Sequence, residues 1–462
     1  MTIADAAPHS ASLTPSADGA RDIPKPVMPW AGVGSAQRWW LLIVLTLASI
    51  LSFMDRSLLK LLVEPLKADL GVSDLQISVL VGLSFSALYS ICCVPMGYVS
   101  DIVNRKKLIG GAVLVWSVMA ATCGLAASYW QLFVGRAGLG IGEAALQPAA
   151  VSLIRDSFPP ERRARAFSVF GLGPLVGSGM AMLLGGLLFA FADRGGTAGW
   201  PLIGHLKAWQ FALVAPAVVG MLLALVVFTI HEPKREPVLA ADRPTFGELG
   251  RHMKTDRLTY FLLFAAPTLW SLAGSGWNGW MAAGIGRTWH MSPGAIGAIG
   301  GPIALVCTPI GLITMGFLMD SLVRRGFKDA TLQITLVAQA LHMVPAMLIF
   351  LAPTKPLMWL AYGASMLFTG TIQVAANTLL AEATPGRLMG KTSAVFNMVQ
   401  NFLGLAVGPT VYALVARGVF GGDTGLVPSM MLCYAVFISL SMALVVFLLA
   451  ARRRRRAQVL AI

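Results

Sequence analysis

The chain has 462 residues, 56% of which are hydrophobic and only 12% charged, whereas an average soluble domain has about 25% charged residues. Its mean hydropathy of +0.73 excludes a water-soluble globular fold. If about 20 apolar residues make one membrane crossing, the chain has room for about ten to twelve crossings and no large soluble domain. We therefore interpret the net charge of +14 as a sign of which side of a membrane the basic connections occupy. No nucleic-acid partner is expected.

Twelve apolar runs long enough to cross a membrane follow one another along the chain. We expect them to be helical, because a backbone in hydrocarbon has to form its hydrogen bonds within its own segment. The predicted runs span residues 39–63, 77–99, 108–128, 130–154, 166–192, 208–230, 258–286, 291–319, 330–354, 356–381, 392–416 and 427–451.

The segments outside these runs divide the chain. Residues 1–38 have the composition of a disordered tail and no signal-peptide core. We expect a first bundle over residues 39–230, a linker over 231–257, a second bundle over 258–451 and a basic tail over 452–462. The tails and alternate connections hold 26 of the 35 Lys and Arg residues, which predicts that both termini and the linker are cytoplasmic.

The basic tail and the cysteines have simple interpretations. The run from Arg452 to Arg456 is typical of an anchor beside an anionic leaflet, so membrane lipids are expected partners. All five cysteines fall inside predicted helices without metal-ligand spacing, so neither a disulfide framework nor a metal site is expected. No cofactor is predicted.

The two halves repeat a pattern after their second helix. Gly97 precedes Asp101 by four residues, and Gly316 precedes Asp320 by the same interval. Basic residues follow in both places. Two repeated halves around a central site are the plan of a transporter that rocks between two states. The predicted fold class is therefore an all-α membrane protein with twelve transmembrane helices in two pseudo-symmetric six-helix bundles.

At these residues the chain resembles the major facilitator superfamily. The signature loop of that family runs Gly-x-x-x-Asp-(Arg/Lys)-x-Gly-Arg-(Arg/Lys), and the matching residues here are Gly97, Asp101, Arg105 and Lys106. Ile102 replaces a basic residue, and Asn104 replaces a glycine. Since Asn tolerates the left-handed backbone conformation, we expect the turn to survive.

We interpret this loop as a cytoplasmic gate. Gly97 is expected to let two helices approach closely, while Asp101 and Arg105 pair with each other or with the neighbouring half. Asp320 and Arg324 are expected to act in the same way in the second half. The alternative is that these residues are ordinary cytoplasmic charges.

Four ionisable residues lie deep in predicted helices and therefore carry the functional hypothesis. Asp55 lies about 24 Å along the first helix, and Arg136 in the fourth lies at a similar depth. The simplest arrangement pairs Asp55 with Arg136, with Glu143 two turns further along the same face as Arg136. Arg56 is about 100° around its helix from Asp55. The cluster is interpreted as either a structural ion pair or a proton-coupling site in which protonation of Asp55 releases Arg136.

The sequence Phe53-Met-Asp-Arg56, together with Gly135-Arg-x-x-x-Gly-x-Gly-Glu143, resembles the spinster-like branch of the superfamily. That branch includes bacterial proteins and animal exporters of sphingosine phosphate and lysophospholipids. The resemblance implies coupling and substrate roles for Asp55, Arg56, Arg136 and Glu143. It also implies a monomer in a bacterial inner membrane.

The second half has one deep ionisable residue, His342, which we expect to be packed or to lie at the lipid interface rather than to carry protons. It also has amides and aromatic side chains suited to an amphipathic cavity, or to hydrogen bonds between helices. The predicted cavity residues are Asn278, Trp280, Asn377, Asn397 and Gln400.

Three functional classes follow. The first is a proton-coupled secondary transporter that exports an amphiphilic anion such as a lysolipid or a sphingoid phosphate. The second is a proton symporter of small organic acids. A membrane-embedded enzyme is the least favoured class, because the sequence has no nucleophile beside a base.

Overall fold

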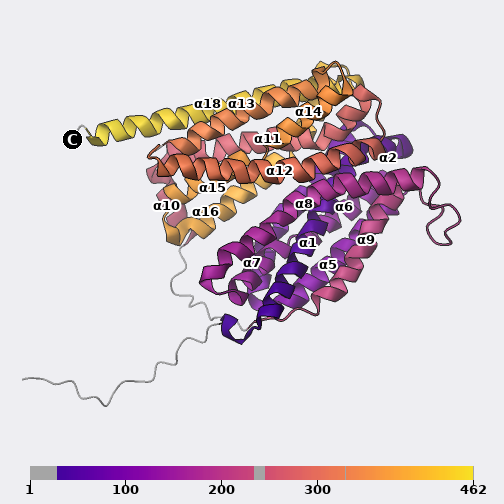
Figure 1. Ribbon diagram of the computed structural model, residues 1–462, viewed down its shortest axis with the longest axis horizontal. Coiled ribbons are helices and arrows are strands. Elements are labelled where there is room, and N and C mark those ends of the chain that lie inside the picture. The colour runs from indigo at the N-terminus through magenta and orange to yellow at the C-terminus, as the bar shows by residue number, and fades with distance from the viewer. Residues whose placement is uncertain (1–28, 234–244, 328, 461–462) are drawn as a thin grey trace, which may run out of the picture.

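The computed structural model describes residues 29–233, 245–327 and 329–460, and these form a molecule built from helices (Figure 1). Within them, eleven helical segments are long and apolar enough to cross a membrane. The helices before the linker are a short 3-10 helix Pro29–Gly32, α1 Ser35–Leu61, α2 Val63–Leu70, α3 Asp74–Ser78, η2 Val79–Leu83, α4 Ser84–Ile102, α5 Arg105–Gly124, α6 Tyr129–Glu143, α7 Leu146–Ser157, α8 Pro160–Asp193 and α9 Ala208–Val227.

The helices of the second group follow the linker. They are α10 Phe246–Thr255, α11 Arg257–Trp289, α12 Pro293–Arg324, α13 Ala330–Leu351, α14 Lys355–Met366, α15 Thr371–Ala383, α16 Gly386–Val399, η4 Gln400–Ala406, α17 Gly408–Val419, a 3-10 turn Asp423–Gly425 and α18 Leu426–Leu460. The predicted all-α membrane fold is confirmed.

The tenth predicted run is not one continuous helix. A turn over residues 367–370 separates α14 from α15. Gly311 of α12 packs against this turn so closely that a Cβ on Gly311 would overlap the Leu367 carbonyl group. The break is therefore held by a contact with another helix, which the apolar composition of the run does not reveal.

The structure extends helices into the predicted tails and linker. α1 begins at Ser35, inside the expected tail 1–38, and residues 1–28 lie outside the described residues. α18 continues through the basic run to Leu460, because Arg, Ala, Gln and Leu all favour helix. Linker residues 245–257 contain α10, while 234–244 are not among the described residues.

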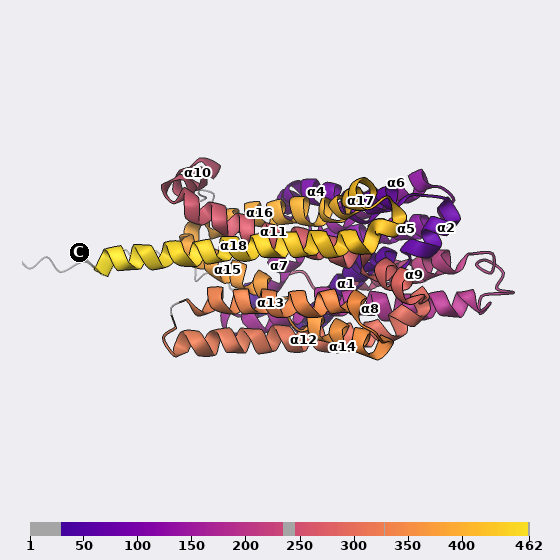
Figure 2. The same ribbon diagram turned by 90° about the horizontal axis from the view of Figure 1, so that it is seen from above.

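The helices from α1 to α9 lie in one group and those from α10 to α18 in another (Figure 1). The groups lie closest near α2 and diverge towards the end that holds α10 and α7. We call these two ends of the molecule the α2 end and the α10 end. α18 extends beyond the other helices at the α10 end (Figure 2).

Candidate functional site

A buried ion pair joins α1 to α6. Arg56 Nε lies 2.5 Å from Glu143 Oε2, and Glu143 is fully buried. The Ser52 hydroxyl donates to the same oxygen over 2.6 Å. Ser52 and Arg56 are four residues apart, so one face of α1 presents both donors to Glu143. The pairing connects two helices through a charge-assisted network inside the membrane.

Three aromatic rings surround the Arg56 guanidinium. Its Cζ lies 4.6 Å from the ring centroid of Phe53, 4.7 Å from that of Phe85 and 4.4 Å from that of Tyr89. Ring faces attract a cation, and the attraction grows when water is excluded. The rings therefore hold Arg56 in place while its side chain stays 14% exposed.

The predicted ion pair between Asp55 and Arg136 is wrong for this conformation. Arg136 Nη1 donates instead to the Asp55 backbone carbonyl over 3.4 Å, and its Nε donates to the Leu80 carbonyl over 3.4 Å. Leu80 belongs to the π-helical segment η2, and π-helical segments are frequent at functional sites. The prediction rested on a similar depth along the two helices, and depth does not determine where side chains point.

Asp55 and Arg136 nevertheless face one small cavity. The cavity has a volume of about 10 Å³, which is the scale of a single water molecule. Within the described residues, Asp55 Oδ2 and Arg136 Nη2 are buried without a hydrogen-bond partner, and so is Glu143 Oε1. An unpaired buried carboxylate oxygen is costly, so both carboxylates of this cluster are incompletely satisfied.

A second charge cluster joins the two helix groups at the α2 end. Arg287 of α11 donates from Nη1 and Nη2 to the two carboxylate oxygens of Asp74, each over 2.8 Å, and from Nε to Glu64 over 2.8 Å. Lys67 also pairs with Asp74. We call Glu64, Lys67, Asp74 and Arg287 the α2-end cluster. It was not predicted, because all four of its members look like ordinary charges in connections between the predicted runs.

Glycines bring the two groups into backbone contact near the same end. A Cβ on Gly297 of α12 would lie 2.7 Å from the Cα of Gly186 of α8. A Cβ on Gly82 would lie 2.5 Å from the Ala406 carbonyl oxygen, which places the π-helical segments η2 and η4 against each other. The α2 half of the molecule is thus closed by packing as well as by charge.

The family assignment follows from the whole chain rather than from one site. The sequence profile of the Major Facilitator Superfamily matches residues 45–409. The chain belongs to the Major Facilitator Superfamily. This membership and the similarity to transporters point to a transporter rather than an enzyme.

Characterised relatives within the superfamily cover several kinds of transporter. The chain is 29% identical over 301 residues to an MFS-type efflux pump of Mycolicibacterium smegmatis, covering 65% of this chain and 64% of that protein. It is 24% identical over 242 residues to the galacturonate transporter of Dickeya chrysanthemi, covering 51% and 66%. It is 26% identical over 210 residues to protein spinster homolog 1 of Rattus norvegicus, covering 45% and 37%. Each match spans less than two thirds of the relative's own length.

The fold resembles that of a solved superfamily member over nearly its whole length. A bacterial homologue of the human lysosomal transporter Spinster, in an inward-facing and unoccupied conformation, superposes with a TM-score of 0.78. The identity is 24%, and the match covers 91% of this chain and 98% of that one. Together with the rat relative, this confirms the predicted spinster-like resemblance.

In the superfamily loop between α4 and α5, Arg105 and Lys106 contact residues of their own helix group. Arg105 is fully buried and lies 2.5 Å from Asp156 at the end of α7. Its Nε donates to Glu232 over 3.3 Å, and Glu232 also accepts from the backbone N–H groups of Arg105 and Lys106. Glu232, which the sequence did not single out, therefore stabilises the start of α5. Asp101 lies exposed at the end of α4.

Two details of the predicted gate differ from the structure. Asn104 has φ of −65° and caps α5 by accepting from the Lys107 N–H over 2.9 Å, so it does not occupy the left-handed region. A Cβ on Gly97 would meet nothing within 4 Å, and the same holds for Gly316. Among the described residues, the Cβ positions of both glycines are therefore open in this conformation.

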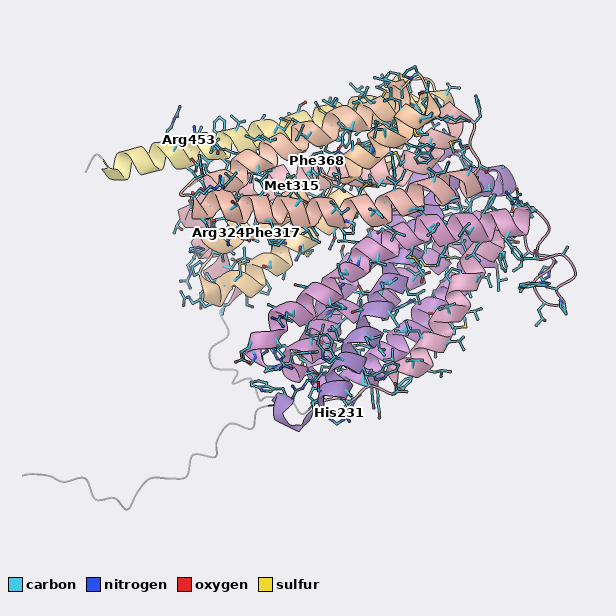
Figure 3. All side chains as sticks on the ribbon, viewed as in Figure 1. His231, Met315, Phe317, Arg324, Phe368 and Arg453 are labelled. Atoms are coloured by element: carbon cyan, nitrogen blue, oxygen red, sulfur yellow. The ribbon has the colours of Figure 1, made fainter. Side chains whose placement is uncertain are left out.

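The second-half gate residues lie at the α10 end. Asp320 and Arg324 are exposed at the end of α12. Arg324 and His231, which follows α9, lie at this end on different helix groups (Figure 3). The structure therefore does not bring Asp320 and Arg324 together with the loop of the first half.

The predicted cavity residues of the second half fall into two sets. Asn278, Asn377 and Asn397 are exposed, and Asn278 donates to the Gly274 carbonyl of its own helix over 2.8 Å. Trp280 is only 1% exposed and donates to the Pro409 carbonyl over 3.0 Å, so it packs in the interior. Gln400 is buried at the start of η4, and its Nε2 has no partner.

Proposed function

We propose that this chain is a proton-coupled secondary transporter that works by alternating access and exports an amphiphilic anion of the lysolipid or sphingoid phosphate class. The observation that carries the proposal is the membrane-embedded cluster of Asp55, Arg56, Arg136 and Glu143. Buried charges inside a membrane are costly and mark ion and substrate pathways. In this proposal the transporter works as a monomer.

The proposed orientation places the α10 end in the cytoplasm of a bacterial inner membrane. Basic residues concentrate in the connections of that end and in both termini, as the positive-inside rule requires. The α2-end cluster then faces outside and closes the molecule there. The halves 39–230 and 258–451 would rock about their interface, and Gly97 and Gly316, which have open space here, would become contacts in the opposite state.

Proton coupling in this proposal centres on Asp55. Deprotonated Asp55 attracts Arg136 across their shared cavity, whereas protonated Asp55 leaves Arg136 on the carbonyl groups of Asp55 and Leu80. Protonation of the Asp55 carboxyl group would thus alter the Arg136 contacts that join α6 to α1 and η2. Glu143 stays paired with Arg56 whether Asp55 is protonated or deprotonated.

The substrate would bind between the two halves. Phe53, which is half-buried beside Arg56, would offer apolar surface next to a cation, which suits an amphiphilic anion. The exposed amides Asn278, Asn377 and Asn397 and the unpartnered Gln400 amide would recognise the remainder of the substrate. This division assigns coupling to the first half and shape recognition to the second.

The alternative proposal is proton symport of a small organic acid. It is supported by the 24% identity to a galacturonate transporter, since galacturonate is a sugar acid. In this alternative an arginine of the cluster would bind a carboxylate.

Transport in proteoliposomes tests the proposal. Wild-type protein should move 1-oleoyl-lysophosphatidate when a pH gradient is imposed, and galacturonate serves as the probe of the alternative. Asp55→Asn should abolish gradient-driven movement while leaving exchange of substrate across the membrane. Asp69→Asn is the matched control, because Asp69 pairs with Lys207 outside the cluster. Unchanged gradient-driven transport by Asp55→Asn would refute coupling through this residue.

A further inference from the structure

Lys60 is a membrane-embedded charge that the proposed coupling mechanism leaves unused. It lies in the last turn of α1, four residues after Arg56, so the two side chains share one face of the helix. Its side chain is partly exposed, as is that of Arg56. Within residues 29–233, 245–327 and 329–460, Lys60 forms no ion pair with a carboxylate.

Arg136 and Arg56 are close enough for their positive charges to act on Lys60. Among the described residues neither nearby carboxylate pairs with Lys60: Glu143 binds Arg56, and Asp55 lines the cavity that it shares with Arg136. The carbonyl end of α1 supplies roughly half an elementary negative charge at most. Lys60 is therefore a surplus cation beside two others, in a medium where charges require a partner.

We propose that Lys60 and Arg56 together bind the anionic head group of the transported substrate. The head group, a phosphate or a carboxylate, would supply the negative charge that Lys60 lacks. Glu143 and Phe85 contact Arg56, and the Arg56 side chain is 14% exposed. This inference rests on the proposed function, since it names the part of the substrate that the first half recognises.

A test that needs no substrate measures the electrostatic potential beside Lys60. Ser57 is three residues from Lys60, so their Cβ atoms are about 5–6 Å apart, and its hydroxyl lies 3.5 Å from that of Ser178 in an exposed pair. Ser57→Cys is introduced as a reporter thiol. The background replaces the native cysteines Cys92, Cys93, Cys123, Cys307 and Cys433 with serine or alanine.

The reporter is reacted with two methanethiosulfonate reagents of opposite charge, the sulfonatoethyl and the trimethylammonium-ethyl compounds. Removing the charge with Lys60→Met should slow the anionic reagent and speed the cationic one by about three- to fivefold each, as expected for a unit charge about 7 Å away in a partly hydrated site. Lys60→Arg should preserve the wild-type ratio. Lys207→Met is the matched control, because the Lys207 charge is already paired with Asp69 outside the α2-end cluster.

Equal reagent ratios with and without Lys60 would overturn the proposal, and so would a thiol that neither reagent reaches. The second measurement is thermal stabilisation of purified protein by 1-oleoyl-lysophosphatidate. Lys60→Met should raise the half-maximal concentration about tenfold, and Lys60→Arg should restore it. Charge-selective labelling without stabilisation by this lipid, but with stabilisation by galacturonate, would support the anion site and refute the proposed lipid class.

Discussion

Arg287 and Asp74 form a two-pronged ion pair across the two helix groups. Both carboxylate oxygens of Asp74 accept a hydrogen bond of 2.8 Å from the guanidinium. Planar pairs of this kind are stronger and more directional than single contacts. Because Arg287 belongs to α11 and Asp74 to α3, the pair is broken whenever the groups separate at the α2 end.

We predict that Arg287→Gln shifts the molecule away from the conformation described here. Hydrogen bonds to charged groups contribute about 1.5–3 kcal/mol, so the population ratio should change by about tenfold or more. Spin labels on Lys107→Cys and Arg325→Cys, both exposed at the α10 end, should report shorter distances by electron resonance. Arg417→Gln is the control, since Arg417 is exposed on α17. Identical distance distributions in Arg287→Gln and wild type would assign the pair no role in closure.

The glycines of α12 should divide into two classes. Gly297→Leu should destabilise this conformation, because even a Cβ would lie 2.7 Å from the Cα of Gly186. Gly316→Leu should be tolerated here, since a Cβ on Gly316 meets nothing within 4 Å, but it should block closure at the α10 end and halt transport. Melting temperatures and the label distances above measure both effects. Equal melting temperatures for the two variants would contradict the assignment.

The sequence predicted the helices better than it predicted the contacts between them. Long apolar runs indicate crossings because hydrocarbon forces backbone groups to pair locally. The turn at residues 367–370 was not predicted, and there the Leu367 carbonyl group packs against Gly311, which is far away in the chain. No local pattern marks such a site.

In the candidate site, too, the sequence predicted the helices that hold the residues better than it predicted the contacts between them. Composition placed Asp55, Arg56, Arg136 and Glu143 deep in the membrane, and all four lie at or beside the α1 and α6 contact. Which carboxylate pairs with which arginine depends on side-chain direction and on the aromatic rings around Arg56, and these are tertiary properties. The sequence analysis did not single out Lys60, although its position could have identified it. It falls four residues after Arg56 within the same apolar run.

Local sequence patterns do not predict the α2-end cluster. Asp74 and Arg287 are separated by 213 positions, and the connection holding Asp74 looked like a polar loop. A charged residue at the end of an apolar run is ordinarily explained by topology. Only the folded arrangement shows that this one has a partner in the other group.

Ser52 and Ser49 provide a matched test of the Glu143 network. Both are buried on α1, but the Ser52 hydroxyl donates to Glu143 over 2.6 Å while the Ser49 hydroxyl has no partner. Ser52→Ala should cost about 1.5–3 kcal/mol because it removes a hydrogen bond to a buried carboxylate. Ser49→Ala should be neutral or slightly stabilising. Denaturation of purified protein measures both, and a larger loss in Ser49→Ala than in Ser52→Ala would count against the network.

His342 joins three elements of the second group. Its Nδ1 is hydrogen-bonded to the Tyr434 hydroxyl, and its Nε2 lies 3.3 Å from Thr369 Oγ1 in the turn between α14 and α15. His342 is only 4% exposed, in agreement with the expectation that it is packed. The side chain therefore ties α13 to α18 and to the helix break.

We predict that His342→Leu lowers stability by about 1–3 kcal/mol, because it leaves the buried Tyr434 hydroxyl without its partner. Tyr434→Phe should cost a comparable amount. Since the two residues share one contact, the double variant should cost less than the sum of the single variants by about 0.5–3 kcal/mol. Unfolding of the purified single and double variants measures this coupling. Strictly additive losses would mean that the two side chains stabilise the helix group independently.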